Sequence, residues 1–268
     1  MTKADISRAR RAAQHLFDAH QRREPFKPLP AELAPATMAE AYDIQDDFVA
    51  LKSDRFGPTV GWKIALTTPK MRAMVGVGDS IGGTLHRDQM HTSPATVRAV
   101  DLLHMIVEFE IAMELAEDLP VADAPFTRER VAQAVGALMP AFEIADDRHA
   151  DYATLSTQAL MLAADNAWNE GAVLGTPVKD WRGIDLAALK GVARINGEVV
   201  GEGYGRDTMG HPMEALAWVA NHLAARGHGL WRGAVVITGS LVTSKFPVAG
   251  DAIDFDLGPL GAVSMKVA

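Results

Sequence analysis

The sequence lacks cysteine and is poor in aromatic residues. None of its 268 residues is Cys, and Phe, Trp and Tyr together make up 6%. Without thiols there are no disulfides, thiolate metal sites or cysteine nucleophiles, and a reducing compartment suits such a chain. The sequence also has no run of about 18 uninterrupted apolar residues and no signal-peptide core near its start. We therefore expect a cytoplasmic protein with no membrane partner.

Positive charge is scarce as well. Lys and Arg number 26 against 34 Asp and Glu, which gives a formal net charge of −8. This balance disfavours nucleic acid or an anionic membrane surface as the main partner. A small anionic substrate would need cations gathered locally. The 48% hydrophobic and 22% charged residues are ordinary for a globular protein with a sizeable core.

What the sequence does contain is an alternating segment at residues 107–115. Its odd-numbered residues are all apolar, whereas Glu108 and Glu110 lie among the even-numbered ones. A strand would stack these two glutamates on one side about 6.5–7 Å apart, and a helix would separate them by roughly 200°. The simplest interpretation is a strand with one solvated face, as in many antiparallel sheets.

A third carboxylate makes a metal site the alternative. Residues 140–146 place two large apolar side chains on one face, so Glu143 would point the other way between two alanines. Three carboxylates that face one point suit Mg²⁺ or Mn²⁺, hard cations that keep water or substrate oxygens in their shell. Glu108, Glu110 and Glu143 are therefore candidate metal ligands.

Helices and strands share the rest of the chain. Apolar residues at helical spacing predict helices at 6–22, 38–53, 157–169 and 213–225, with a short helix starting at Thr68-Pro69. Alternating patterns predict strands at 60–66, 234–238, 252–255 and 262–267, and Asn196-Gly197 predicts a type I′ hairpin within 192–200. Two helices therefore precede the first strand.

Three further segments carry possible chemistry. On its face of the strand at 60–66, Lys63 is flanked by Gly61 and Ala65; it either points to water from an edge strand or lies in a cleft and moves protons. The glycine-rich run 76–85 lacks the Gly-Lys-Ser/Thr ending of a phosphate loop, and we interpret it as a mobile flap. Ser240 lacks a nucleophile elbow and is a candidate substrate contact.

An ordered set of short motifs resembles one family. The likeness is to the 2-keto-4-pentenoate hydratase branch of the fumarylacetoacetate hydrolase superfamily, and it runs from about residue 8 to the C-terminus. Its motifs are Gly61-Trp62-Lys63-Ile64, Gly83-Thr84-Leu85, Glu108-x-Glu110, Glu143, Ala164-Asp165-Asn166-Ala167, Gly210-His211-Pro212 and Thr238-Gly239-Ser240. The resemblance implies an α+β fold. A small N-terminal helical domain with the first strand (1–75) would precede a β-rich mixed roll of the fumarylacetoacetate hydrolase C-terminal type (76–268).

The resemblance also implies the chemistry. Mg²⁺ or Mn²⁺ would be held by the residues that match the family's metal ligands, which are Glu108, Glu110 and Glu143. Lys63 matches the family lysine, and Gly83, Thr84 and Leu85 match the segment that contacts the substrate. A small 2-hydroxy-2,4-dienoic or 2-oxo acid would chelate the ion, and hydration would give a 4-hydroxy-2-oxo acid.

The chain departs from the hydratase pattern at two places. His104-Met105-Ile106 stands where close hydratases carry Gln-Pro-Arg, and Ile81 stands where they carry an acid. The water-activating base is then unassigned, and Asp79 is the candidate if its loop shifts. A 4-oxalocrotonate-type decarboxylase is the main alternative, followed by a carbon–carbon hydrolase and a non-catalytic partner subunit. In each case we expect a homo-oligomer or a complex with a pathway decarboxylase or hydratase.

Overall fold

The computed structural model describes residues 7–268. Its helices are α1 (Arg8–Gln21), α2 (Met38–Phe56), α3 (Pro69–Val75), α4 (Arg128–Ala134), α5 (Ala159–Ala164) and α6 (Pro212–Ala225). Its strands are β1 (Thr59–Ala65), β2 (Ile81–His86), β3 (Met90–Thr92), β4 (Ala95–Val97), β5 (Met105–Leu115), β6 (Val135–Asp146), β7 (Asn169–Leu174), β8 (Lys190–Ile195), β9 (Glu198–Tyr204), β10 (Val235–Ile237), β11 (Ala252–Asp256) and β12 (Ala262–Val267). Within this part of the chain, no helix is both long enough and apolar enough to cross a membrane.

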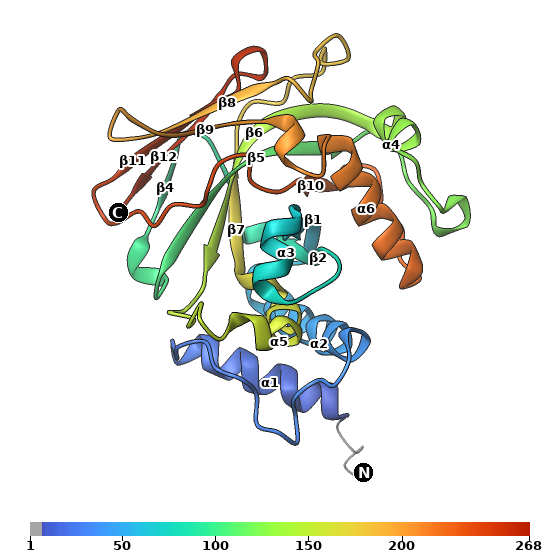
Figure 1. Ribbon diagram of the computed structural model, residues 1–268, viewed down its shortest axis with the longest axis vertical. Helices are drawn as coiled ribbons and strands as arrows, with labels where there is room; N and C mark the ends of the chain where they lie inside the picture. The colour runs from blue at the N-terminus through green and yellow to red at the C-terminus, as the bar shows by residue number, and fades with distance from the viewer. Residues whose placement is uncertain (1–6) are drawn as a thin grey trace.

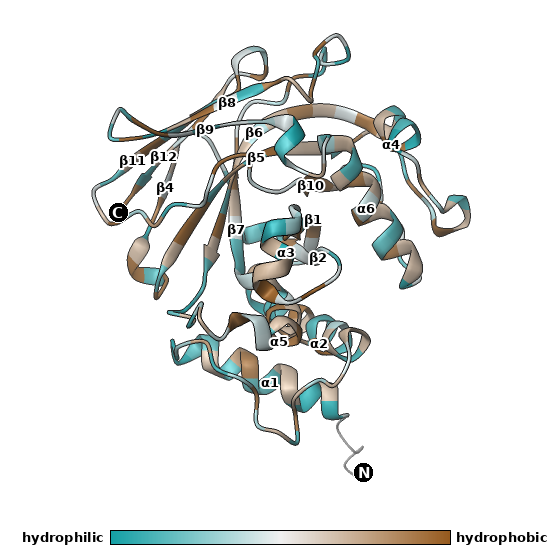
Figure 2. Ribbon diagram, viewed as in Figure 1, coloured by the Kyte–Doolittle hydropathy of each residue, from teal (hydrophilic) through white to brown (hydrophobic). Residues whose placement is uncertain are grey.

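The first two helices begin at capping residues that the sequence supplies. Ser7 accepts a hydrogen bond from the backbone N–H of Arg10 at the start of α1. Thr37 does the same for Glu40 at the start of α2, while the Glu40 carboxylate accepts from the N–H of Ala36. Both helices pack with α5 at one end of the molecule (Figure 1), around a shared apolar core. Along α1 and α6 the colour alternates between hydrophobic and hydrophilic, as amphipathic helices require (Figure 2).

Two mixed sheets form the other end. The larger has seven strands in the order β2-β1-β10-β5-β6-β7-β3, and the smaller has five in the order β4-β12-β11-β8-β9. The longest ladder is the antiparallel pair β5 and β6, which places Glu108 opposite Glu143. The apolar face of β5 is buried in the main core, which also takes in α6 and the smaller sheet. The predicted α+β architecture of helices followed by a mixed roll of strands is confirmed.

The opposite face of the large sheet carries a small apolar cluster. Strand β2 at one end of the sheet lies against β7 near the other end, so this face is enclosed. The cluster contains Leu85, Ala112, Met139, Ala141 and Ile237, all buried. By strand alternation these residues lie on the same face of the sheet as Lys63 and the three glutamates. The charged side chains therefore lie next to a buried apolar cluster.

The domain boundary drawn from the sequence at residue 75 falls between two paired strands. β1 lies inside the large sheet, with β2 antiparallel on one side and β10 parallel on the other. Likewise α5, from the middle of the chain, packs in the core of the N-terminal helices. The single strand of residues 7–75, β1, therefore lies between two strands of residues 76–268.

Two local predictions are wrong. The helix expected over 157–169 ends at Ala164, and Asn166, Ala167 and Trp168 adopt positive φ values of 52°, 47° and 64°. Only tertiary contacts can hold three such residues in the left-handed region. The glycine-rich run is not a flap throughout, because residues 81–85 belong to the buried strand β2. The hairpin is confirmed, with φ of 53° at Asn196 and 83° at Gly197.

Candidate metal centre

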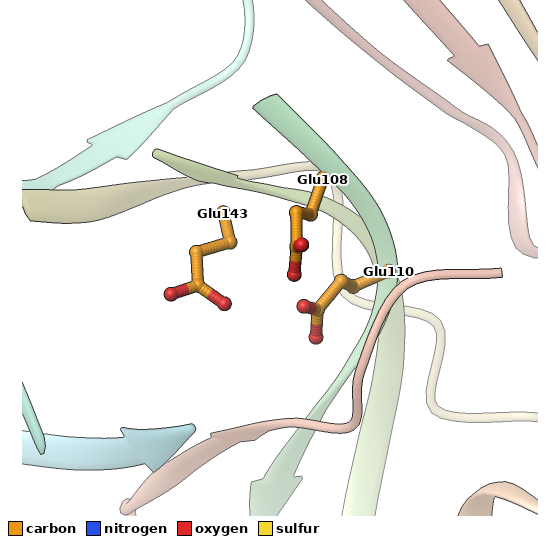
Figure 3. Close-up of side chains that lie close together, drawn as sticks. All are labelled: Glu108, Glu110 and Glu143. Atoms are coloured by element: carbon orange, nitrogen blue, oxygen red, sulfur yellow. The ribbon is translucent and has the colours of Figure 1, made fainter. Parts of the chain in front are cut away.

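The register of β5 and β6 brings the three predicted glutamates together. Glu108 and Glu110 project from the same face of β5, and Glu143 lies opposite Glu108 on β6. One oxygen from each carboxylate lies within 4.8 Å of the other two. Figure 3 shows the three side chains turned toward a common space. Glu110 and Glu143 are 0% exposed, so the solvated-face interpretation is wrong.

Each glutamate is held through one of its two oxygens. The backbone N–H of Gly239 donates to Glu110 Oε2 at 2.6 Å. The hydroxyl of Ser244 donates to Glu108 Oε1 at 2.7 Å. Gly239 has a φ of +95°, and a Cβ there would lie 2.5 Å from Thr67 Cγ2. Only glycine fits at this position while presenting its N–H to the carboxylate.

Glu143 receives two side-chain donors on one oxygen. Lys63 Nζ lies 3.0 Å from Oε1, and Asn169 Nδ2 donates to the same oxygen at 2.9 Å. Lys63 is 3% exposed, and its strand is an inner strand of the sheet, so the alternative of an edge lysine in water is wrong. Its ammonium also donates to the carbonyl of Ala167 at 3.5 Å, in the left-handed turn.

The charges of the site perturb one another strongly. Burial and then the neighbouring Glu143 and Glu108 raise the pKa of Glu110 well above its usual range. Burial also raises the pKa of Glu143, although Lys63 opposes the change. Burial disfavours the Lys63 ammonium, but the three carboxylates outweigh it and raise its pKa. The site thus concentrates more negative charge than one lysine neutralises.

The donor set fits a divalent cation. Within residues 7–268, Glu110 Oε1 and Glu143 Oε2 are buried and have no hydrogen-bond partner. Orphaned buried carboxylate oxygens are costly unless an ion satisfies them. Three carboxylates without nitrogen or sulfur ligands are typical of Mg²⁺ or Mn²⁺ sites, in which water or substrate completes the shell.

The predicted substrate-contact residues lie beside this centre, and some of their groups already have partners within the protein. Gly83 pairs with Lys63, and a Cβ on it would lie 3.1 Å from Lys63 Cδ. The backbone N–H of Thr84 donates to Asn166 Oδ1 at 2.7 Å. Leu85 belongs to the small apolar cluster. The hydroxyl of Ser240 accepts from Phe109 N at 2.8 Å and donates to Val242 O at 2.6 Å.

Asp79 lies apart from the glutamates. It is exposed, and it accepts a hydrogen bond from Trp218 Nε1 at 2.9 Å. The two faces of strand β2 have different neighbours. A Cβ on Gly83 would face Lys63, whereas a Cβ on Gly82 would face Trp218 and His222 of α6. Asp79 shares the α6 side of the strand, and its predicted catalytic role has no supporting contact with Lys63.

Two residues that build the site had no signal in the sequence, and a third was noted only as part of a family motif. Ser244 and Asn169 bind the glutamates across 136 and 26 positions of sequence. Asn166 stood within a family motif, and the structure shows it clamping Thr84 through both its amide nitrogen and its oxygen. Such supporting contacts depend on chain crossings that no local pattern encodes.

The sequence is similar to a known protein family and to curated proteins over most of its length. Residues 70–268 match the family model described as fumarylacetoacetate (FAA) hydrolase C-terminal. A 2-hydroxyhexa-2,4-dienoate hydratase from Comamonas testosteroni is 31% identical over 255 residues, covering 94% of this chain and 95% of that protein. A 4-oxalocrotonate decarboxylase from Pseudomonas putida is 29% identical over 254 residues, covering 95% and 94%.

Solved structures agree with these matches. The structure of 4-oxalocrotonate decarboxylase from Pseudomonas putida G7, complexed with magnesium and adipate, matches with a TM-score of 0.89 and 27% identity over 99% of both chains. The same enzyme complexed with calcium and acetate matches equally well. Family model, full-length relatives and fold coincide, and the chain therefore belongs to the fumarylacetoacetate hydrolase family.

Proposed function

We propose that this protein is a divalent-metal-dependent lyase that adds water to a 2-hydroxy-2,4-dienoate to give a 4-hydroxy-2-oxo acid. The observation that carries the proposal is the trio of Glu108, Glu110 and Glu143, with two orphaned buried oxygens, directly beside the buried Lys63. The similarity to a dienoate hydratase over 94% of the chain supports the substrate class.

A divalent ion held by the three glutamates would supply positive charge that favours the enolate form of a chelating 2-oxo acid. Lys63 would then handle the proton. Its raised pKa keeps Nζ charged at neutral pH, so it first acts as a proton donor to a substrate carbon. Once neutral, the amine can accept a proton that the 2-hydroxyl group of the substrate or the attacking water releases, which restores the ammonium. Gly83 on the paired strand lets the Lys63 side chain and the Asn166 turn pack closely, which holds Nζ beside Glu143.

We assign the substrate's place to the strand segment Gly83, Thr84 and Leu85, with Ser240 as a further contact. Leu85 and its apolar cluster would exclude water from one side of the chain of the substrate. For Asp79 to act as the base that activates water, residues 76–80 would have to move and the hydrogen bond to Trp218 would have to break.

Decarboxylation of a 4-oxalocrotonate-type acid is the second candidate. It needs the same enolate but no water-activating base, and Asp79 is turned toward Trp218 rather than Lys63. The full-length structural likeness to a 4-oxalocrotonate decarboxylase also favours it. Carbon–carbon hydrolysis would need a further base near the glutamates, and residues 7–268 place none in contact with them. A non-catalytic partner subunit would not need so complete a site.

One assay separates these functions. The protein is stripped of metal, then supplied with Mg²⁺ or Mn²⁺ and a panel of 2-hydroxy-2,4-dienoates and 4-oxalocrotonate, while dienol absorbance and CO₂ are followed. Loss of absorbance without CO₂ supports hydration, and loss with CO₂ supports decarboxylation. No metal-dependent turnover with any of these acids would refute both.

The setting of the enzyme completes the proposal. We propose Mg²⁺ or Mn²⁺ as the working ion, because the ligands are carboxylate oxygens only. A cytoplasmic location suits a chain without cysteine. Self-association, or association with a decarboxylase or hydratase of the same pathway, is proposed as the assembly, and light scattering with and without the partner tests it.

A further inference from the structure

Glu143 Oε1 has two side-chain donors, Lys63 and Asn169, and only Asn169 can keep its hydrogen bond throughout a reaction. Lys63 is the proposed proton carrier, so its ammonium changes charge and partner as the substrate reacts. Asn169 donates to the same oxygen at 2.9 Å and is neutral. It therefore provides a hydrogen bond to Glu143 that the chemistry does not disturb.

The orientation of the Asn169 amide is set by a tight local turn. Its Oδ1 accepts from the backbone N–H of Gly171 at 3.1 Å, so its Nδ2 must face Glu143. A bulge lies in the same strand, because consecutive residues Ile144 and Ala145 of β6 pair with Gly171 and Asn169 of β7 and leave Glu170 unpaired between them. Bulges beside active sites commonly re-aim one side chain. Gly171 has a φ of +134°, and a Cβ there would lie 2.2 Å from Gln89 O, so no other residue fits this turn.

The backbone of Asn169 is fixed from the helical end of the molecule. Lys52 of α2 donates to the Asn169 carbonyl at 3.1 Å and pairs with Glu170 at 3.0 Å. His20 of α1 lies 3.3 Å from the same Glu170 carboxylate. Each of these side chains is mostly buried. Side chains of the N-terminal helices α1 and α2 thus fix the segment of Asn169, the residue that donates to Glu143.

We propose that Asn169 is a positioning residue for the metal centre: its amide occupies Glu143 Oε1 and leaves Oε2 turned toward the divalent ion. Oε2 is buried and has no hydrogen-bond partner in the described chain, as this arrangement requires. Without the amide, Glu143 can rotate about its terminal bond and offer either oxygen to Lys63. The inference rests on the metal centre of the proposed function.

Two variants separate positioning from folding. Asn169→Ser removes the amide that reaches Glu143, but its hydroxyl can still accept from the Gly171 N–H, as serine does in comparable turns. Asn169→Ala removes the contacts with Glu143 and the Gly171 N–H, and also the longer hydrogen bond from Nδ2 to the Gly171 carbonyl at 3.4 Å. Asn221→Ala is the matched control, because Asn221 on α6 clamps the backbone of Phe126 by two hydrogen bonds in another part of the structure.

Mg²⁺ binding to the full chain is measured by calorimetry, and Mn²⁺ binding by electron paramagnetic resonance. Both Asn169 variants should bind Mg²⁺ about 10–100-fold more weakly than the wild type, as loss of a residue supporting a metal ligand typically causes. Turnover should return to near the wild-type kcat at saturating Mg²⁺, while Asn221→Ala changes the affinity less than twofold.

The outcomes separate the inference from the proposed function. If the wild type binds Mg²⁺ and Asn169→Ser binds it within twofold of the wild type, the positioning role is overturned and the metal centre survives. If the wild type itself binds neither Mg²⁺ nor Mn²⁺, the metal centre and the inference fall together. If Asn169→Ala fails to fold, the serine variant still decides.

Discussion

Replacing Glu110 by glutamine should make the metal-free protein more stable while abolishing its response to Mg²⁺. The Glu110 side chain is fully buried, and burial followed by Glu143 and Glu108 raises its pKa well above the usual range. A carboxyl whose folded pKa exceeds its unfolded pKa costs stability as pH rises from about 4.5, because the unfolded chain releases the proton first. Above the folded pKa the cost is complete, and glutamine does not incur it.

The size of the effect follows from the contacts. Glutamine can keep its carbonyl oxygen on the Gly239 N–H and place its amide nitrogen where the orphaned Oε1 now lies. A hydrogen bond from that nitrogen to a neighbouring carboxylate contributes about 1.5–3 kcal/mol. Saturating Mg²⁺, at about 100 times its Kd, adds roughly 2.7 kcal/mol to the wild type alone. The variant should therefore lead by about 2 kcal/mol in EDTA and lose that lead in Mg²⁺.

Urea unfolding followed by tryptophan fluorescence at pH 7.5, in EDTA and in Mg²⁺, measures both effects. Glu114→Gln serves as the control, since Glu114 lies on the same face of β5 but outside the trio. A Glu110→Gln protein that is less stable than the wild type in EDTA would refute the account of buried repulsion. One that keeps the full response to Mg²⁺ would refute the ligand role.

Three further predictions follow from named contacts. Lys63→Met should lower kcat/KM by about 10²–10⁴-fold while Mg²⁺ affinity, measured by calorimetry, is kept or increased, because a positive charge leaves the site; normal turnover would contradict the proton role. Gly239→Ala should cost about 1–3 kcal/mol and weaken Mg²⁺ binding, whereas Gly261→Ala, at a positive φ with open space around it, should change only stability in urea unfolding. His20 has a raised pKa, with the Asp165 carboxylate overcoming burial, so its contribution is present below pH 6.5 and is lost as pH rises through the folded pKa. Thermal unfolding should accordingly show a larger deficit for His20→Phe at pH 6 than at pH 9, and an equal deficit at both would count against the ion pair.

The metal ligands were predictable from the sequence because their signal is local. The alternation around Glu108 and Glu110 fixes one face of a strand, and Glu143 stands out among its small neighbours. The environment of Lys63 was ambiguous, because the sequence pattern of β1 does not show whether it is an inner or an edge strand of the sheet. The structure resolves the ambiguity through a parallel neighbour, β10, that arrives about 170 residues later in the chain.

What failed had no local signal. The turn at Asn166, Ala167 and Trp168 looks like the end of an apolar helix, and only the clamp of Asn166 on Thr84 and the carbonyl of Ala167 on Lys63 explain its left-handed backbone. The glycines at 82 and 83 suggest mobility, yet they permit close approach: a Cβ on Gly83 would lie 3.0 Å from Asn166 O. The short helix α4 is the exception: it went unpredicted although its capping residue, Thr127, is a local signal.

The place of β1 has a practical consequence for expression work. The family match begins at residue 70, but the strand that carries Lys63 ends at Ala65 and separates β2 from β10. A truncated protein that starts at residue 70 would lack β1, an inner strand of the large sheet. Strands β2 and β10 would then each have an unpaired edge, and unpaired strand edges promote aggregation. Truncations should therefore retain Thr59–Ala65, or restore it in trans as a synthetic peptide.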